Sequence, residues 1–256
     1  FSLIFATAQS LVALTGFQTW QTIVRFGAGP VLRGEWAQFG RLAWLCAVID
    51  VAGAATGTLV AGLVFFVLAG VLGLNPAYVE MAFWFNCALL WSRLTTPTGI
   101  VRVLDRFDVG SYVESVVPLG RLIASGVIVA TGPSVAKFLL AWALFDLLAA
   151  GLYWLAAWRL APQALGQSHP RQWRTALAEN PGITGFFGIT YLSSSFEALT
   201  RHGPLFLVGW FLGTSAGGLY RLADQLAQGV KLFSGLVVRA VFPVLAVSQM
   251  AEEAQA

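Results

Sequence analysis

Charged residues are scarce in this chain of 256 residues, and so are the residues that build most catalytic and metal sites. Charged side chains make up 11% of the sequence, and there are only two cysteines and two histidines. So few polar groups cannot coat the surface of a soluble domain of this length. Cys46 and Cys87 lie inside apolar stretches without metal-ligand spacing, so we expect both to be buried as small apolar side chains.

The motifs of the common enzyme classes are also missing. The sequence has no Gly-x-Ser-x-Gly turn, no His-Glu-x-x-His pair, no phosphate-binding glycine loop and no acidic cluster for a divalent metal. We therefore predict no catalytic residue, no metal site and no cofactor. The net charge of +3 does not indicate nucleic acid as a partner, because the basic residues lie between apolar runs and are better explained by orientation in a membrane.

Long apolar runs dominate what the sequence does contain. Hydrophobic residues make up 57% of the chain, and the mean hydropathy is +0.74. Runs of about 20 residues or more match the length that a helix needs to cross a bilayer. We predict an all-α, polytopic transmembrane helix bundle. Its seven apolar segments are residues 1–24, 43–73, 78–98, 112–131, 135–158, 182–212 and 216–247.

Two features inside these segments predict local geometry. In the sixth segment, Gly203-Pro204 is expected to kink or break the helix, because proline lacks an N–H and its ring clashes with the preceding turn. In the second segment, Gly53, Gly57 and Ala61 recur at helical spacing and predict a face on which another helix packs closely.

Arginine is distributed unevenly among the connections between the segments. It is absent from residues 73–77, 131–134 and 213–215. The alternation predicts that the arginine-bearing connections are cytoplasmic. The longest of them, residues 161–181, is interpreted as a cytoplasmic linker between an N-terminal lobe (1–160) and the start of a C-terminal lobe (182–256). The arginines in or beside the basic connections are Arg25, Arg33, Arg41, Arg93, Arg102, Arg106, Arg159, Arg171 and Arg174.

The seventh segment carries a polar stripe. At 100° per residue its polar side chains fall within an arc of about 120°. We favour the hypothesis that this stripe is the wall of a hydrated cavity that attracts an anionic group, because charges at bilayer depth usually face a cavity or a partner. The alternative is a packed helix whose charges snorkel from both ends. The stripe consists of Arg221, Asp224, Gln225, Gln228, Lys231 and Arg239.

Three further groups of ionisable residues are candidates. Arg25 ends a polar face on the first segment, which is either an entry to the same cavity or an interfacial helix end beside lipid phosphates. Glu197 and Arg201 are four residues apart and form either a gate or a neutralised ion pair. Arg121 and Asp146 lie at comparable depth in neighbouring segments, and a salt bridge is the preferred interpretation.

The seventh segment and the residues before it resemble a known family. The run Gly217-Gly218-Leu219-Tyr220-Arg221-Leu222-Ala223-Asp224-Gln225-Leu226, preceded by residues 208–216, and the closing Val241-Phe242-Pro243-Val244-Leu245 are similar to the flippase branch of the multidrug/oligosaccharidyl-lipid/polysaccharide superfamily. The turn Thr96-Pro97-Thr98-Gly99-Ile100-Val101-Arg102 and residues 105–108 are similar to a turn of the same branch, which includes the O-antigen flippases.

This resemblance implies a two-lobe fold of the MATE type, of which the chain covers spans two to eight and lacks the first. It implies a flippase that moves a lipid-linked oligosaccharide, on an undecaprenyl-type carrier, across the cytoplasmic (inner) membrane for polysaccharide or lipopolysaccharide synthesis. Arg221, Lys231 and Arg239 would then form the cationic wall of the cavity. The implied partners are the lipid-linked oligosaccharide, membrane lipids and other glycan assembly proteins.

Two other functions stay open at this point. A drug or metabolite antiporter of the same superfamily would favour an aromatic and acidic cavity over this basic one. A membrane-embedded glycan polymerase or ligase would need extracytoplasmic loops with catalytic Arg, His or Asp, and the predicted outer connections are short and lack all three. A purely structural scaffold is the remaining alternative.

Overall fold

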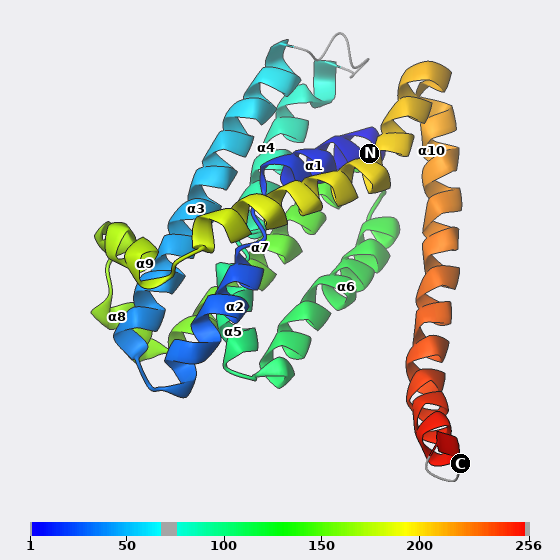
Figure 1. The fold of residues 1–256 in the computed structure, drawn as a ribbon. Coiled ribbons are helices and arrows are strands. Elements are labelled where there is room, and N and C mark those ends of the chain that lie inside the picture. The colour runs from blue at the N-terminus through cyan, green and yellow to red at the C-terminus, as the bar shows by residue number, and fades with distance from the viewer. Residues whose placement is uncertain (1, 68–75, 254–256) are drawn as a thin grey trace. The chain divides into compact units, whose positions relative to one another are not determined.

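The computed structural model describes residues 2–67 and 76–253, and the described residues are helices joined by short turns, with no strand among them (Figure 1). Side chains are described as far as Gly229, apart from residues 2, 3, 6, 198, 201, 202, 206, 210 and 214. The all-α prediction is therefore confirmed. The α-helices are α1 (Ser2–Thr15), α2 (Thr19–Leu32), α3 (Trp36–Gly62), α4 (Val79–Ser92), α5 (Thr96–Val103), α6 (Phe107–Ala130), α7 (Val135–Leu160), α8 (Pro162–Gln167), α9 (Trp173–Glu179) and α10 (Ile183–Glu253).

Three helices in the described part of the chain are long and apolar enough to cross a membrane. They are α3 with the π-helical turn that follows it (Trp36–Val67), α6 and α7. Large apolar side chains on α6 and α7 are exposed, among them Leu122, Ile123 and Leu140. Surfaces of this kind suit a lipid solvent and would be a liability in water. The chain is thus an all-α membrane protein.

Two of the seven expected segments are not continuous helices. The first is interrupted between Thr15 and Thr19, and the third between Ser92 and Thr96. The helices on either side, α1, α2 and α4, have 14 residues each, which is too short to span a bilayer alone. Pro97 is the second residue of α5, in the first helical turn, where its missing N–H costs no helical hydrogen bond and its fixed φ favours a helix start. The prediction of unbroken first and third segments is wrong.

The long helix α10 also differs from expectation. Helical structure continues through Gly203 and Pro204, so the helix does not break there, and the kink that was the other expectation stays a prediction. The backbone leaves the helical region at Gly213, with φ 87° and ψ 172°. Glycine has no Cβ to clash in that conformation. This agrees with the connection expected between the sixth and seventh segments.

The chain divides into two compact units, which we describe separately. The first comprises residues 3–203 and the second residues 204–256. Within the first unit, α10 begins against the break between α1 and α2, because Tyr191 Oη donates to the carbonyl of Leu14 at 2.7 Å and its ring stacks on Phe17 at 4.9 Å between centroids. The predicted lobe boundary at residues 161–181 stays a prediction.

The first unit has two apolar clusters with a polar layer between them. One cluster gathers α2, α5, α8 and α9 around the first half of α3, and the other gathers α1, α4 and α7 around its end. Between them, Gly53 and Gly57 allow the close packing that their spacing predicts: a Cβ at these positions would lie 2.6 and 2.5 Å from oxygens of Thr15. Cys46 and Cys87 are both buried, as expected.

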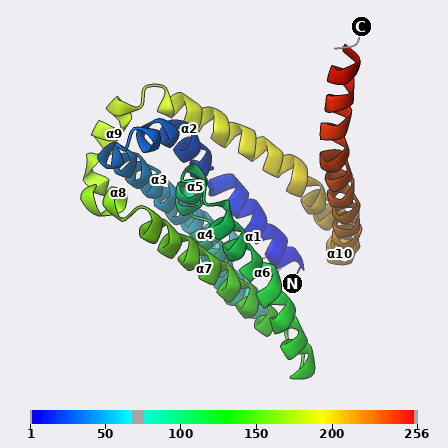
Figure 2. The ribbon, with the colours of Figure 1, turned by 90° about the horizontal axis from the view of Figure 1, so that it is seen from below.

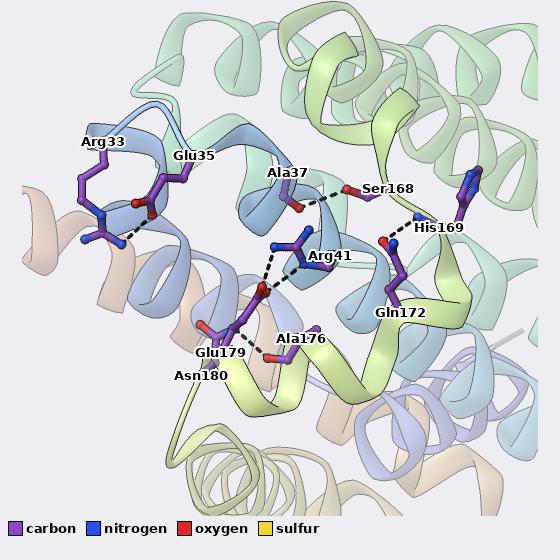
Figure 3. Close-up of polar contacts among 10 residues, drawn as sticks. All are labelled: Arg33, Glu35, Ala37, Arg41, Ser168, His169, Gln172, Ala176, Glu179 and Asn180. Carbon is purple, nitrogen blue, oxygen red and sulfur yellow. Dashed lines mark hydrogen bonds and ion pairs between the residues drawn. The ribbon is translucent and has the colours of Figure 1, made fainter.

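The segment expected to be a linker is folded against the first two turns of α3, and α8 and α9 lie on the outside of that helix (Figures 1 and 2). Arg41 binds Glu179 through two hydrogen bonds of 2.9 and 2.5 Å, and Ser168 Oγ donates to the carbonyl of Ala37 at 3.1 Å (Figure 3). Trp44 Nε1 donates to the carbonyl of Leu165 at 3.2 Å. These contacts fix the segment to a membrane-spanning helix.

Gly40 makes this docking possible, because a Cβ there would overlap the carbonyl oxygen of Ala164. We expect Gly40→Ala to loosen the segment and to speed tryptic cleavage after Arg171 and Arg174 at least about fivefold, which corresponds to a loss of about 1 kcal/mol of docking. Cleavage rates of the detergent-solubilised protein, followed by mass spectrometry, test this. Gly166→Ala is the matched control, since nothing lies within 4 Å of its added Cβ. Equal cleavage of the two variants would contradict the role of Gly40.

Candidate functional site

Asp50 lies in the polar layer of the first unit and is 5% exposed. Its carboxylate oxygens lie 2.8 and 2.9 Å from Thr19 Oγ1. The backbone N–H and the hydroxyl of Thr96 both donate to Oδ2 at 2.8 Å. Thr19 and Thr96 are the first residues of α2 and α5. One carboxylate therefore accepts hydrogen bonds at the N-terminal ends of two helices, where backbone N–H groups are unpaired and a negative charge is stabilised.

The two helix breaks are joined by threonine hydroxyls as well as by Asp50. Thr95 Oγ1 lies 2.8 Å from Thr19 Oγ1 and donates to the carbonyl of Phe17 at 3.2 Å. Non-helical backbone at membrane depth is tolerated only where its polar groups find partners inside the protein. Thr95 and Asp50 supply these partners, so the breaks in the first and third segments depend on each other. The sequence signal for this site was a single acid inside a long apolar segment, and our sequence reasoning passed over it.

A cavity of about 430 Å³ adjoins this layer, between the α4–α5 connection, α6 and α7. A second hollow of about 350 Å³ shares five of its residues: Trp20, Thr98, Arg102, Glu114 and Tyr153. Trp20 and Thr95 in the cavity wall are the direct neighbours of Thr19 and Thr96. The carboxylate of Asp50 thus holds the two chain segments that form one side of the cavity.

Charge in the cavity wall is unbalanced toward cations. Its lining includes three arginines, Arg93, Arg102 and Arg121, and two acids, Glu114 and Asp146. Arg102 lies 3.8 Å from Glu114, and its guanidinium is 4.4 Å from the ring of Trp20. Arg93 is exposed, and no acid lies within ion-pair distance of it in the described part of the chain. The cavity therefore holds one cation more than its own acids neutralise.

The ion pair expected between Arg121 and Asp146 is present, with Nη2 and Oδ2 2.6 Å apart. The two side chains are 20% and 6% exposed, and the guanidinium also lies 5.2 Å from the ring of Trp142. Arg121 Nε is buried and has no hydrogen-bond partner among the described residues. The charge of Arg121 is therefore held by Asp146, and its buried Nε is unpaired in the described part of the chain.

Tyr153, on α7, joins this helix to α6 beside the cavity. Its hydroxyl donates to Glu114 Oε1 at 3.0 Å and lies 3.3 Å from the carbonyl of Gly110. Glu114 is thereby shared between Tyr153 and Arg102. An aromatic face, a hydroxyl and alternating charges in one wall can bind a ligand that has both polar and apolar surfaces.

The residues predicted on the seventh segment belong to the second unit. Arg221, Asp224 and Gln228 are half-buried, whereas Gln225 of the same stripe is exposed, as are Leu222 and Leu226 on the same helix. The side chains of Lys231 and Arg239 lie outside the described residues. The cavity role of this stripe stays a prediction.

The other candidate residues fall elsewhere in the first unit. Arg25 lies over the ring of Phe186 at 4.7 Å and does not line the cavity described above. Glu197 is exposed, and the side chain of Arg201 lies outside the described residues, so a gate or an ion pair between them stays a prediction. Sequence reasoning did not connect Arg93 and Arg102 with Arg121, because they come from three separate elements.

Comparison with known proteins supports the membrane assignment. The chain is 26% identical over 245 residues to the Inner membrane protein YghQ of Escherichia coli (strain K12), a match that covers 92% of this chain and 67% of that protein. No protein-family profile matches the chain, and no solved structure matches it. This similarity and the membrane-length helices assign the chain to the inner membrane.

Proposed function

We propose that the protein is a flippase that moves a lipid-linked oligosaccharide across the inner membrane for polysaccharide synthesis, and that the cavity of the first unit binds the phosphate groups of this substrate. The observation that supports the proposal is the surplus of cations in that cavity. Arg93 has no acidic partner there, and Arg121 retains an unpaired Nε.

In this proposal the arginines replace the water molecules that the phosphate groups of the substrate lose on entering the membrane. A phosphate or diphosphate cannot cross about 30 Å of hydrocarbon without replacement of its hydration shell. A guanidinium offers several donors in a plane and matches phosphate oxygens well. Arg93 binds first in this proposal, because no internal pair has to be broken. Arg102 and Arg121 contribute further donors once the substrate is bound. When the cavity is empty, Glu114 and Asp146 neutralise them.

Release on the other side requires that binding stays moderate. Glu114 and Asp146 compete with the phosphate for Arg102 and Arg121, so part of the binding free energy is offset by internal pairs that must loosen. Trp20 and Tyr153 present apolar ring faces and a hydroxyl beside the arginines, which suits the mixed surface of a sugar. The lipid tail remains in the bilayer beside the exposed apolar face of α6.

A drug or metabolite antiporter is a weaker proposal for the same cavity. Its cationic substrates would need an acidic surplus, whereas the described cavity has three arginines against two acids.

We expect Arg93→Ala, made in the native gene, to lower surface polysaccharide about tenfold and to raise the pool of lipid-linked precursor in the cell. The reason is the loss of a charge-assisted contact, worth about 1.5 kcal/mol or more. Extraction and quantification of both pools measure this. Arg106→Ala is the matched control, because Arg106 is exposed, pairs with Asp108 and is absent from the cavity lining. Normal polysaccharide in the Arg93 variant, at normal membrane levels of the protein, would oppose the proposal.

A further inference from the structure

The outer face of the segment docked on α3 carries exposed cations and an exposed aromatic ring. Arg171, Trp173 and Arg174 are all exposed, Trp173 to 44%. The guanidinium of Arg174 lies 5.1 Å from the centroid of the Trp173 ring. We name these three residues the basic face. None of them takes part in the cavity described above.

The basic face has no acid to neutralise it within its own segment. Residues 160–178 contain neither Asp nor Glu. Glu179, the first acid that follows, accepts two hydrogen bonds from Arg41 (Figure 3). Arg171 and Arg174 form no ion pair among the described residues. The face therefore presents two uncompensated positive charges.

Its position in the first unit places this face at the end of two membrane-spanning helices. The segment begins directly after α7, whose last turn carries exposed Trp158 and Arg159. It packs on Ala37, Gly40 and Arg41, in the first two turns of α3. Tryptophan and arginine at the ends of spanning helices favour the lipid headgroup layer. The predicted arginine bias assigns this end to the cytoplasmic leaflet.

We propose that the basic face binds anionic phospholipid headgroups of the cytoplasmic leaflet, with Arg171 and Arg174 on the phosphates and Trp173 at the boundary with the acyl chains. Charge complementarity selects a lipid over an uncharged partner, because each basic residue at an anionic membrane surface raises the affinity about fivefold. The hydrogen bonds to α3 hold the segment in place, so the face is presented to the membrane in one orientation. This lipid contact is independent of the transported substrate and of the cavity.

The test uses the purified protein in neutral detergent, with an environment-sensitive dye on Gln172→Cys, an exposed position between Arg171 and Trp173. Cys46 and Cys87 are buried and do not compete for the dye under native conditions. Short-chain phosphatidylglycerol is titrated, with phosphatidylcholine of the same chain length and inorganic phosphate as separate arms. We expect a saturable blue shift with phosphatidylglycerol and none in the other two arms.

Substitution separates the basic face from other anion sites. Arg171→Gln with Arg174→Gln is expected to raise the half-saturating phosphatidylglycerol concentration about 25-fold, about fivefold for each charge. Arg33→Gln is the control, because Arg33 is an exposed cation in the loop before α3 that already pairs with Glu35; a change below twofold is expected. Equal response to phosphatidylcholine, an equal response to inorganic phosphate, or an unshifted titration of the double variant would each overturn the proposal.

Discussion

Replacing Asp50 by alanine is expected to lower the free energy of unfolding by about 3 kcal/mol, because three hydrogen bonds to a buried charge are lost and the N–H of Thr96 is left without an acceptor. The change also removes the side chain that joins the N-terminal ends of α2 and α5. Titration of the protein in mixed micelles with sodium dodecyl sulfate, followed by far-UV circular dichroism, measures the loss.

Asp50→Asn is the matched comparison for this prediction. An amide still accepts from Thr96 through its oxygen and can donate to Thr19 Oγ1, so about half of the loss is expected. Because Trp20 and Thr95 in the cavity wall neighbour the two threonines that Asp50 binds, the alanine variant should also bind substrate more weakly. A stability of the alanine variant within 1 kcal/mol of the wild type would show that Asp50 does not hold the two helix breaks together.

Asp146→Ala is expected to lower the free energy of unfolding by about 3 to 5 kcal/mol, since it leaves Arg121 as an uncompensated charge among membrane helices. The double variant Arg121→Met with Asp146→Leu removes both charges and should recover most of the stability. Unfolding in the same mixed micelles gives both values. If the single variant is as stable as the wild type, the pair does not neutralise a buried charge.

The exposed pair Arg33–Glu35 provides the control. Its side chains are 58% and 43% exposed, and the hydrogen bond from Arg33 lowers the pKa of the Glu35 carboxyl. Exposed pairs contribute little to stability because water screens them, so Glu35→Ala should leave the free energy of unfolding unchanged.

The stable double variant Arg121→Met with Asp146→Leu should still fail to export polysaccharide. This result would separate the proposed role of Arg121 in the cavity from its role in stability.

Helices α6 and α7 could be predicted from sequence because their apolar character is local. Segments 112–131 and 135–158 correspond to α6 and α7, with the largest difference at the start of α6. The ion pair between Arg121 and Asp146 also followed from simple helix geometry, since both residues lie in regular neighbouring helices. Local hydropathy and a fixed rise per residue are sufficient for features of this kind.

Local hydropathy and helix geometry did not predict the breaks in the first and third segments. Thr15, Gln18 and Thr95 are compatible with a continuous helix, and Asp50, which binds the ends of both α2 and α5, comes from a third helix. Thr19 is 31 positions from Asp50 in the sequence, and Thr96 is 46 positions from it. The hydropathy that reveals an apolar segment is an average over many residues. A single acid such as Asp50 changes this average little, although it organises the polar layer.

The cavity escaped sequence analysis for a related reason. A stripe along one helix, such as Arg221 to Arg239, is visible as a period in the sequence. Arg93, Arg102 and Arg121 come from a connection and two different helices, and only the fold brings them to one wall. The sequence therefore directed attention to the seventh segment and left the basic cavity of the first unit unrecognised.

In the proposed function, this cavity binds the phosphate groups of a lipid carrier. The most direct measurement is the equilibrium affinity of the purified protein for undecaprenyl diphosphate and for undecaprenol, which has the same tail without phosphate, by native mass spectrometry. We predict that the wild type prefers the diphosphate at least about tenfold and that Arg93→Ala loses most of this preference, whereas Arg106→Ala keeps it. Equal affinity for the two lipids, or an unchanged preference in the Arg93 variant, would contradict the proposed function.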